Sequence, residues 1–131
     1  MGQSRIGNIM KILLAEDDPN IIKIAQMVLE RVGGHQVDAA IDGGEALSKA
    51  LNNDYDLIVL DGMMPVHPGL EVCQLYKQQK KGPQARIIFL SAKSSQKDIK
   101  DFLENGDGYI QKPFEPKDLC LLIDDILLKA A

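Results

Sequence analysis

The sequence contains few of the residues that mark several special classes of protein. It has no tryptophan, two cysteines and two histidines, and aromatic residues make up 5% of its 131 positions. Two cysteines are too few for the disulfide framework of a small secreted domain. Cys73 and Cys120 fall within helical patterns, and we expect both to be packing residues. The low number of cysteines excludes a disulfide-stabilised domain. Neither His35 nor His67 stands where a metal ligand would be expected.

Long apolar runs and strong positive charge are also absent. No segment approaches the roughly 20 apolar residues that a membrane-spanning helix needs. The first eight residues are mostly polar and the apolar run after them is interrupted by Lys11, which does not fit a signal peptide. The net charge of −4 argues against binding nucleic acid through charge alone. We expect a cytoplasmic protein with no direct contact to nucleic acid or to a membrane.

The composition is that of one globular domain. Hydrophobic residues make up 45% of the chain and charged residues 26%, which excludes a disordered tail, a collagen-like repeat and a coiled coil. There is no internal repeat and no linker. We expect residues 1–9 to be an N-terminal extension and residues 10–130 to form a single domain.

Short apolar runs predict buried parallel strands. Residues 12–15, 57–60 and 87–90 are continuously apolar and each run ends abruptly in polar residues, as strands covered on both faces do. Weaker strands are predicted over residues 36–41 and 109–111.

Helical patterns separate these runs. Asp18 before Pro19 predicts the start of a helix, and Asp42 with Glu45 predicts a second. Further helices are expected over residues 70–80 and 95–105 and from Pro116 onward. The first helix should bury Ile21, Ala25, Val28 and Val32. Five successive βα units predict a flavodoxin-like (βα)5 fold, a three-layer sandwich around a five-stranded parallel sheet.

Four of the expected strands end in polar side chains. These are Glu16, Asp17 and Asp18 after the first strand, Asp61 after the third, Ser91 after the fourth and Lys112 after the fifth. Sites in open parallel sheets form at the carboxyl ends of the strands, so these groups should meet at one edge. Crowded carboxylates favour a divalent cation, and oxygen ligands favour Mg²⁺ over Zn²⁺. A lysine and a hydroxyl beside them suit a phosphoryl group.

Four motifs in this order resemble the receiver domain of two-component response regulators, of the chemotaxis-receiver type. They are residues 13–18 (LLAEDD), residues 61–65 (DGMMP) with Gly69, residues 91–93 (SAK) and residues 109–114 (YIQKPF). The resemblance covers about residues 10–129. Any one motif alone is weak evidence, but all four at this spacing are specific.

The resemblance implies a role for each site residue. Asp61 would accept a phosphoryl group from a phosphohistidine of a sensor kinase or a histidine phosphotransfer protein. Mg²⁺ would be bound directly by Asp17 and Asp61, through water by Glu16, and by the backbone carbonyl of Met63. Lys112 would contact the phosphoryl group, and its bond to Pro113 is expected to be cis. The domain would not be an enzyme beyond its own phosphorylation and dephosphorylation.

The resemblance also implies a switch. Ser91 would move toward the phosphoryl group and the ring of Tyr109 would turn inward behind it. The face formed by the fourth helix, fifth strand and fifth helix would then change its binding of a downstream partner or of a second copy of the chain. The exposed side chains expected on this face are Lys93, Lys97, Lys100, Tyr109 and Lys117.

Two segments depart from the family pattern. The loop after Pro65 reads Val66-His67-Pro68, and the segment between Gly106 and Tyr109 is one residue shorter than usual.

The main alternative is an unphosphorylated receiver-like interaction module. A haloacid-dehalogenase-type phosphohydrolase would need an aspartate where Met63 stands. A flavin-binding flavodoxin would need a phosphate-binding loop where the first strand ends in carboxylates.

Overall fold

The computed structural model describes residues 9–130 and contains a five-stranded sheet in the order β2-β1-β3-β4-β5. Every pair of neighbouring strands is parallel. The strands are β1 (Lys11–Ala15), β2 (Gln36–Ala40), β3 (Leu57–Asp61), β4 (Arg86–Ser91) and β5 (Gly108–Gln111). The predicted strands are therefore confirmed, with ends that differ by a residue or so.

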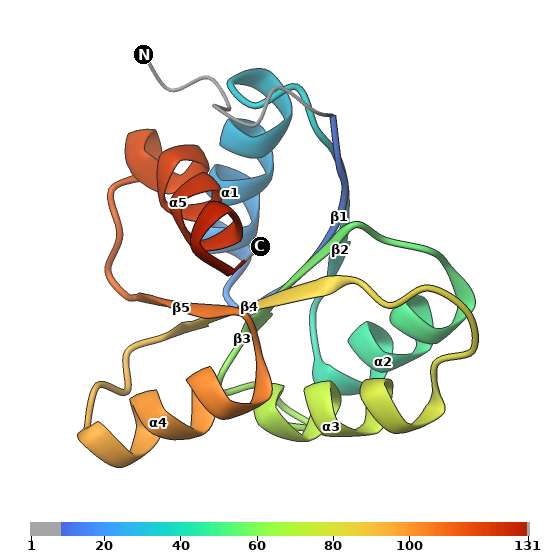
Figure 1. Ribbon diagram of the computed structural model, residues 1–131. Helices are drawn as coiled ribbons and strands as arrows, with labels where there is room; N and C mark the ends of the chain where they lie inside the picture. The colour runs from blue at the N-terminus through green and yellow to red at the C-terminus, as the bar shows by residue number, and fades with distance from the viewer. Residues whose placement is uncertain (1–8, 131) are drawn as a thin grey trace.

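Helices cover both faces of this sheet (Figure 1). They are α1 (Pro19–Arg31), α2 (Gly43–Asn52), α3 (Gly69–Gln79), α4 (Gln96–Asn105) and α5 (Leu119–Ala130), with a 3₁₀ turn over Pro116–Asp118 before α5. Helices α1 and α5 lie on one face, and α2, α3 and α4 lie on the other. This arrangement confirms the predicted flavodoxin-like fold.

The sheet separates two hydrophobic cores. In β1, Ile12 and Leu14 face the core under α1 and α5, whereas Leu13 and Ala15 face the core under α2, α3 and α4. Side chains alternate across a strand, so an apolar run without alternation is buried only where both faces are covered. The continuous runs in the sequence are explained by this double cover.

Helices α1 and α2 begin with the predicted capping side chains, and α4 begins with Ser95 as a cap that the sequence analysis had placed inside the helix. Asp18 Oδ1 accepts from the Asn20 N–H at 2.9 Å, Asp42 Oδ1 from the Glu45 N–H at 2.7 Å, and Ser95 Oγ from the Asp98 N–H at 3.1 Å. These bonds satisfy amide groups that the first helical turn leaves unpaired.

The structure departs from the expected inner face of α1 at two residues: Ile21 is half-buried rather than buried, and Val32 is exposed. Val32 is 39% exposed, and Leu29 is buried in its place. The helix ends at Arg31 and the chain then turns through Gly33 and Gly34, so Val32 is carried away from the sheet.

The loop between β3 and α3 contains a residue in the left-handed region. Val66 has a φ of 73°, and the His67 N–H donates to the Pro65 carbonyl across it at 2.9 Å. The same carbonyl accepts from the Gly43 N–H at 3.0 Å, which ties the loop to the start of α2. A β-branched residue is strained in this conformation.

We expect Val66→Gly to raise the free energy of unfolding by about 1 kcal/mol. It relieves a strain of about 1–3 kcal/mol and adds chain flexibility that costs about 0.5–1 kcal/mol. Urea denaturation measures the difference. Val32→Gly is the matched control, because Val32 is also exposed but has a φ of −86°; it should lose about 0.5–1 kcal/mol. A loss of stability in Val66→Gly would contradict the strain at this position.

Within residues 9–130, no helix is long and apolar enough to span a membrane. Of the predicted N-terminal extension, residues 1–8 lie outside the described residues, and Ile9 is 70% exposed.

Candidate functional site

The carboxyl ends of β1, β3, β4 and β5 meet at one edge of the sheet. Glu16, Asp17, Asp61, Ser91 and Lys112 line the same cavity there. Glu16 is 0% exposed, Asp61 is 4% exposed, and Asp17 lies at the surface. The structure thus brings together all the polar residues that the sequence placed at this edge.

One ammonium group lies between the two buried carboxylates. Lys112 Nζ is 2.6 Å from Glu16 Oε1 and 3.2 Å from Asp61 Oδ1. Burial lowers the pKa of Lys112, but the contact with Glu16 and the charge of Asp61 outweigh burial and raise it above its ordinary value. Lys112 is therefore held as a cation beside Asp61.

The surroundings of Asp61 disfavour its ionised form, whereas those of Lys112 favour the charged form of the lysine. Burial and the neighbouring Glu16 carboxyl group raise the pKa of Asp61 above its ordinary value. The Met63 N–H, which donates to Asp61 Oδ1 at 3.2 Å, and Lys112 act in the opposite direction. One lysine does not fully compensate the buried negative charge of this site.

The donor set fits a hard divalent cation. Glu16, Asp17 and Asp61 each offer a carboxylate oxygen, and these oxygens lie within 4.8 Å of one another. Lys112 Nζ contacts both Glu16 and Asp61 of this cluster. Carboxylate oxygens are preferred ligands of Mg²⁺, and a cation here would offset the repulsion between the three groups.

The hydroxyl group of Ser91 lies next to the acidic cluster and is buried. Its Oγ accepts from the Lys93 N–H at 3.1 Å. The Tyr109 hydroxyl donates to the Lys93 carbonyl at 2.7 Å and also lies 3.4 Å from the Ser91 carbonyl. Ser91 and Tyr109 are thus joined through Lys93. The predicted inward turn of Tyr109 stays a prediction.

Sequence reasoning did not single out Phe102 of α4. Its ring stacks on Tyr109, with centroids 5.3 Å apart and planes at 13°, and it packs on Phe89 with centroids 4.9 Å apart. A lone phenylalanine in a helical pattern predicts only core packing, so no signal in the sequence points to this contact.

The shortened segment between Gly106 and Tyr109 is hydrogen-bonded to β4. Helix α4 ends at Asn105 with Gly106 as its cap, as expected. In this segment, the Asp107 carboxylate accepts from the Ile87 N–H at 2.8 Å. The backbone N–H of Asp107 donates to the Ile87 carbonyl. The Lys112–Pro113 peptide bond is cis, as predicted.

Fold and site together define an α/β domain with an acidic centre at the carboxyl ends of its strands. The sequence profile of the response regulator receiver domain matches residues 12–124, and the chain belongs to that family. Receiver domains are signalling modules rather than classical enzymes, and they bind Mg²⁺ at an acidic pocket.

Curated relatives are regulators of the same kind. The chain is 38% identical over 125 residues to the transcriptional regulatory protein ResD of Bacillus subtilis, covering 95% of this chain and 50% of ResD. It is 41% identical over 118 residues to the response regulator ArlR of Staphylococcus saprophyticus, covering 89% of this chain and 52% of ArlR. The chain therefore spans about half the length of these relatives.

Solved structures agree with the fold. The receiver domain of the Francisella response regulator 1452 superposes with a TM-score of 0.81 at 30% identity, covering 93% of this chain and 99% of that one. The response regulator TrrA of Thermotoga maritima, solved in complex with Mg²⁺ and beryllium fluoride, gives a TM-score of 0.76 at 33% identity, covering 90% of this chain and 99% of TrrA.

Proposed function

We propose that this chain is the phosphoacceptor switch of a two-component system, with Asp61 as the acceptor. The observation that carries the proposal is the position of Lys112 Nζ, 3.2 Å from Asp61 Oδ1 and in contact with Glu16. A buried carboxylate with a cation beside it can take up a phosphoryl group whose charge the same cation then neutralises.

The reaction needs a phosphohistidine donor on a sensor kinase or a histidine phosphotransfer protein. An Asp61 carboxylate oxygen attacks phosphorus, the oxygen–phosphorus bond forms, and the phosphorus–nitrogen bond breaks. The electron pair of that bond stays on the imidazole. Lys112 neutralises the oxygens of the transferred group, and Ser91 donates a hydrogen bond to one of them.

Four groups would hold Mg²⁺ in this proposal: the carboxylates of Glu16, Asp17 and Asp61 and the backbone carbonyl of Met63. When bound, Mg²⁺ supplies positive charge to the transferring phosphoryl oxygens. The fit rests on the three carboxylate oxygens within 4.8 Å of one another.

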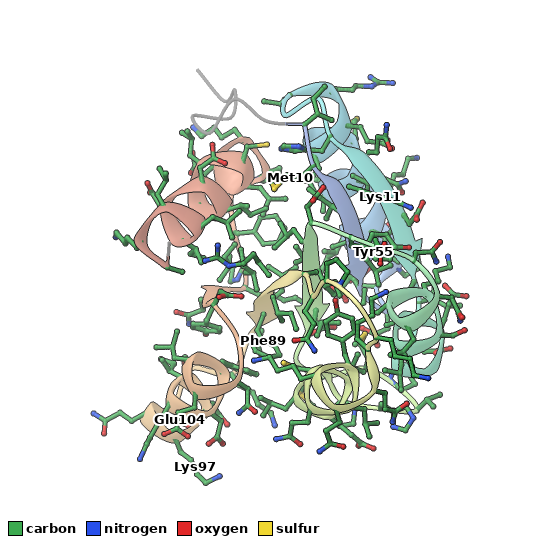
Figure 2. The ribbon with its side chains drawn as sticks, turned by 45° about the vertical axis from the view of Figure 1, so that its right-hand side comes forward. Met10, Lys11, Tyr55, Phe89, Lys97 and Glu104 are labelled. Carbon is green, nitrogen blue, oxygen red and sulfur yellow. The ribbon has the colours of Figure 1, made fainter. Side chains whose placement is uncertain are left out.

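The output would be a change in binding at the face formed by α4, β5 and α5. Lys93, Lys97, Lys100 and Lys117 are exposed on or beside this face, and Tyr109 is half-buried there. Figure 2 labels Lys97 and Glu104 on the side of α4 that points away from the sheet. A downstream protein or a second copy of the chain would bind there. Residues 10–130 would form the functional unit, in the cytoplasm, without direct contact to nucleic acid or a membrane.

The first test is the intact mass of the protein after incubation with Mg²⁺ and acetyl phosphate. We expect the parent chain to gain one phosphoryl group and Asp61→Asn to gain none. Asp101→Asn is the matched control, because Asp101 lies on α4 and pairs with Lys97 outside the site; it should be phosphorylated like the parent.

Absence of any mass gain in the parent, together with no binding of Mg²⁺, would overturn the proposal. The chain would then be an unphosphorylated interaction module with a receiver fold. Equal mass gain in the parent and in Asp61→Asn would place the acceptor elsewhere.

A further inference from the structure

The loop between β3 and α3 carries Met63, whose backbone carbonyl is one of the groups proposed to hold Mg²⁺. The ends of this loop are fixed by two backbone bonds. The Gly62 N–H donates to the Leu90 carbonyl of β4 at 2.8 Å, and the Gly69 N–H donates to the Gly62 carbonyl at 3.2 Å. Among the described residues, no backbone hydrogen bond joins the rest of the loop to a strand. The sheet alone therefore does not fix the middle of the loop.

The middle of the loop is attached to helix α2, which packs beside α3 on the same face of the sheet (Figure 1). The Pro65 carbonyl accepts from the N–H of Gly43, the first residue of α2, at 3.0 Å. The buried side chain of Met64 belongs to the same core as Ala46 of α2. These two contacts connect α2 to the two residues that directly follow Met63.

Position 43 has no space for a side chain. A Cβ atom on Gly43 would lie 2.1 Å from the His67 carbonyl oxygen and 2.8 Å from the His67 carbonyl carbon. Both are backbone atoms of the loop, so only a displacement of the loop or of the helix could relieve the overlap. The close approach of α2 to the loop therefore requires glycine at this position.

The start of α2 is the more rigid of the two partners. Asp42 Oδ1 accepts from the Glu45 N–H at 2.7 Å, and Glu45 Oε1 accepts from the Ile41 N–H at 3.2 Å. This reciprocal pair is a capping box, which fixes the first helical turn. The loop contains Val66 in the left-handed region, where a β-branched residue is strained. An atom added at position 43 is therefore expected to displace the loop.

We infer that Gly43 is a positioning residue for Mg²⁺, because it allows the start of α2 to hold the loop where the Met63 carbonyl meets the acidic cluster. The inference rests on the proposed function. Pro65, which bonds to Gly43, is two residues from Met63, so little chain separates this contact from the metal ligand. Groups outside a metal site that orient its ligands commonly change metal affinity by about 10- to 100-fold when they are lost.

The test is a titration of the ¹⁵N-labelled protein with MgCl₂, followed by ¹H–¹⁵N NMR. We expect Gly43→Ala to raise the Kd for Mg²⁺ by about 10-fold. The amide signal of Met63, whose N–H donates to Asp61 Oδ1 at 3.2 Å, should also differ from that of the parent before any Mg²⁺ is added. A loss of global stability alone would not move this signal in the folded protein.

Two glycine substitutions are matched controls. Gly106→Ala adds a Cβ atom 2.7 Å from Phe89 Cε2 and 3.0 Å from the Ile87 carbonyl oxygen, away from the loop. It should lower the denaturation midpoint without changing the Kd for Mg²⁺ or the Met63 signal. Gly44→Ala changes the same turn of α2, but its Cβ would meet the Val66 side chain rather than loop backbone. It should also leave the Kd unchanged.

A second pair of variants decides the inference if Gly43→Ala does not fold. Asp42→Ala removes the cap that fixes the start of α2 and adds no atom to the loop. Asp42→Ser removes the same charge but keeps an oxygen that can cap the helix. We expect Asp42→Ala to raise the Kd for Mg²⁺ by about 3-fold and Asp42→Ser to keep the Kd of the parent.

The outcomes separate the inference from the proposed function. If the parent binds Mg²⁺ and Gly43→Ala binds it with the same Kd, the inference is wrong and the phosphoacceptor function stands. Where Gly43→Ala does not fold, equal Kd values for Asp42→Ala and Asp42→Ser have the same meaning. A rise in Kd that Gly106→Ala shares equally would also contradict a specific role for Gly43. If the parent does not bind Mg²⁺, the proposed metal site fails and the inference fails with it.

Discussion

Lys112→Ala is expected to lower the free energy of unfolding by about 3–5 kcal/mol in the absence of Mg²⁺. The substitution removes the cation from between Glu16, which is 0% exposed, and Asp61, which is 4% exposed. Two buried carboxyl groups then face each other without a compensating charge. The loss should be largest at pH values where both groups are ionised.

Chemical denaturation of Lys112→Ala with and without Mg²⁺ measures this effect. Because binding to the folded state alone stabilises it, saturating Mg²⁺ should restore part of the loss. Asp61→Asn in the Lys112→Ala background should restore stability as well, since it removes one of the opposed charges. Lys97→Ala is the control: its pair with Asp101 is exposed, so its loss should stay within about 0.5 kcal/mol. A loss of that small size in Lys112→Ala would contradict the electrostatic account.

Gly69→Ala is expected to cost about 1–3 kcal/mol of stability and to impair phosphorylation. A Cβ atom at position 69 would lie 2.4 Å from the Asp61 carbonyl oxygen and 3.1 Å from its carbonyl carbon. These are backbone atoms of the strand that carries the candidate acceptor, so they cannot move aside as a flexible side chain can. The first residue of α3 thus has to be glycine for Asp61 to keep its position.

The rate of phosphorylation by acetyl phosphate and the denaturation midpoint measure the two effects. We expect a rate at least about tenfold lower, since small displacements of reacting groups are costly in phosphoryl transfer. Gly44→Ala is the control, because its added Cβ would meet Val66 Cγ1 at 3.2 Å and no strand backbone. It should change stability by less than about 1 kcal/mol. An unchanged rate in Gly69→Ala would show that the β3–α3 loop does not constrain Asp61.

Much of the fold follows from local patterns. The apolar run from Ile12 to Ala15 predicted a strand covered on both faces, and the caps at Asp18 and Asp42 predicted the starts of two helices. The pattern failed at Val32, because apolar residues at helical spacing do not show where the helix ends.

The candidate site was largely predictable for a topological reason. In a parallel sheet every strand ends at the same edge, so Glu16, Asp61, Ser91 and Lys112 had to come close wherever the strands were correctly placed. The order of the strands and the distances within the site did not follow from this argument. They depend on which strands pair and on how the loops after them are closed.

Local sequence, through apolar runs, caps and the polar residues at strand ends, determined the fold class, the family and the residues of the acidic site. Tertiary structure alone decided that Lys112 lies between Glu16 and Asp61, that Gly69 meets the Asp61 backbone, and that Phe102 joins α4 to Tyr109. These are contacts between residues far apart in the chain. Side-chain packing at a helix–sheet interface depends on all its neighbours together, and no short segment encodes it.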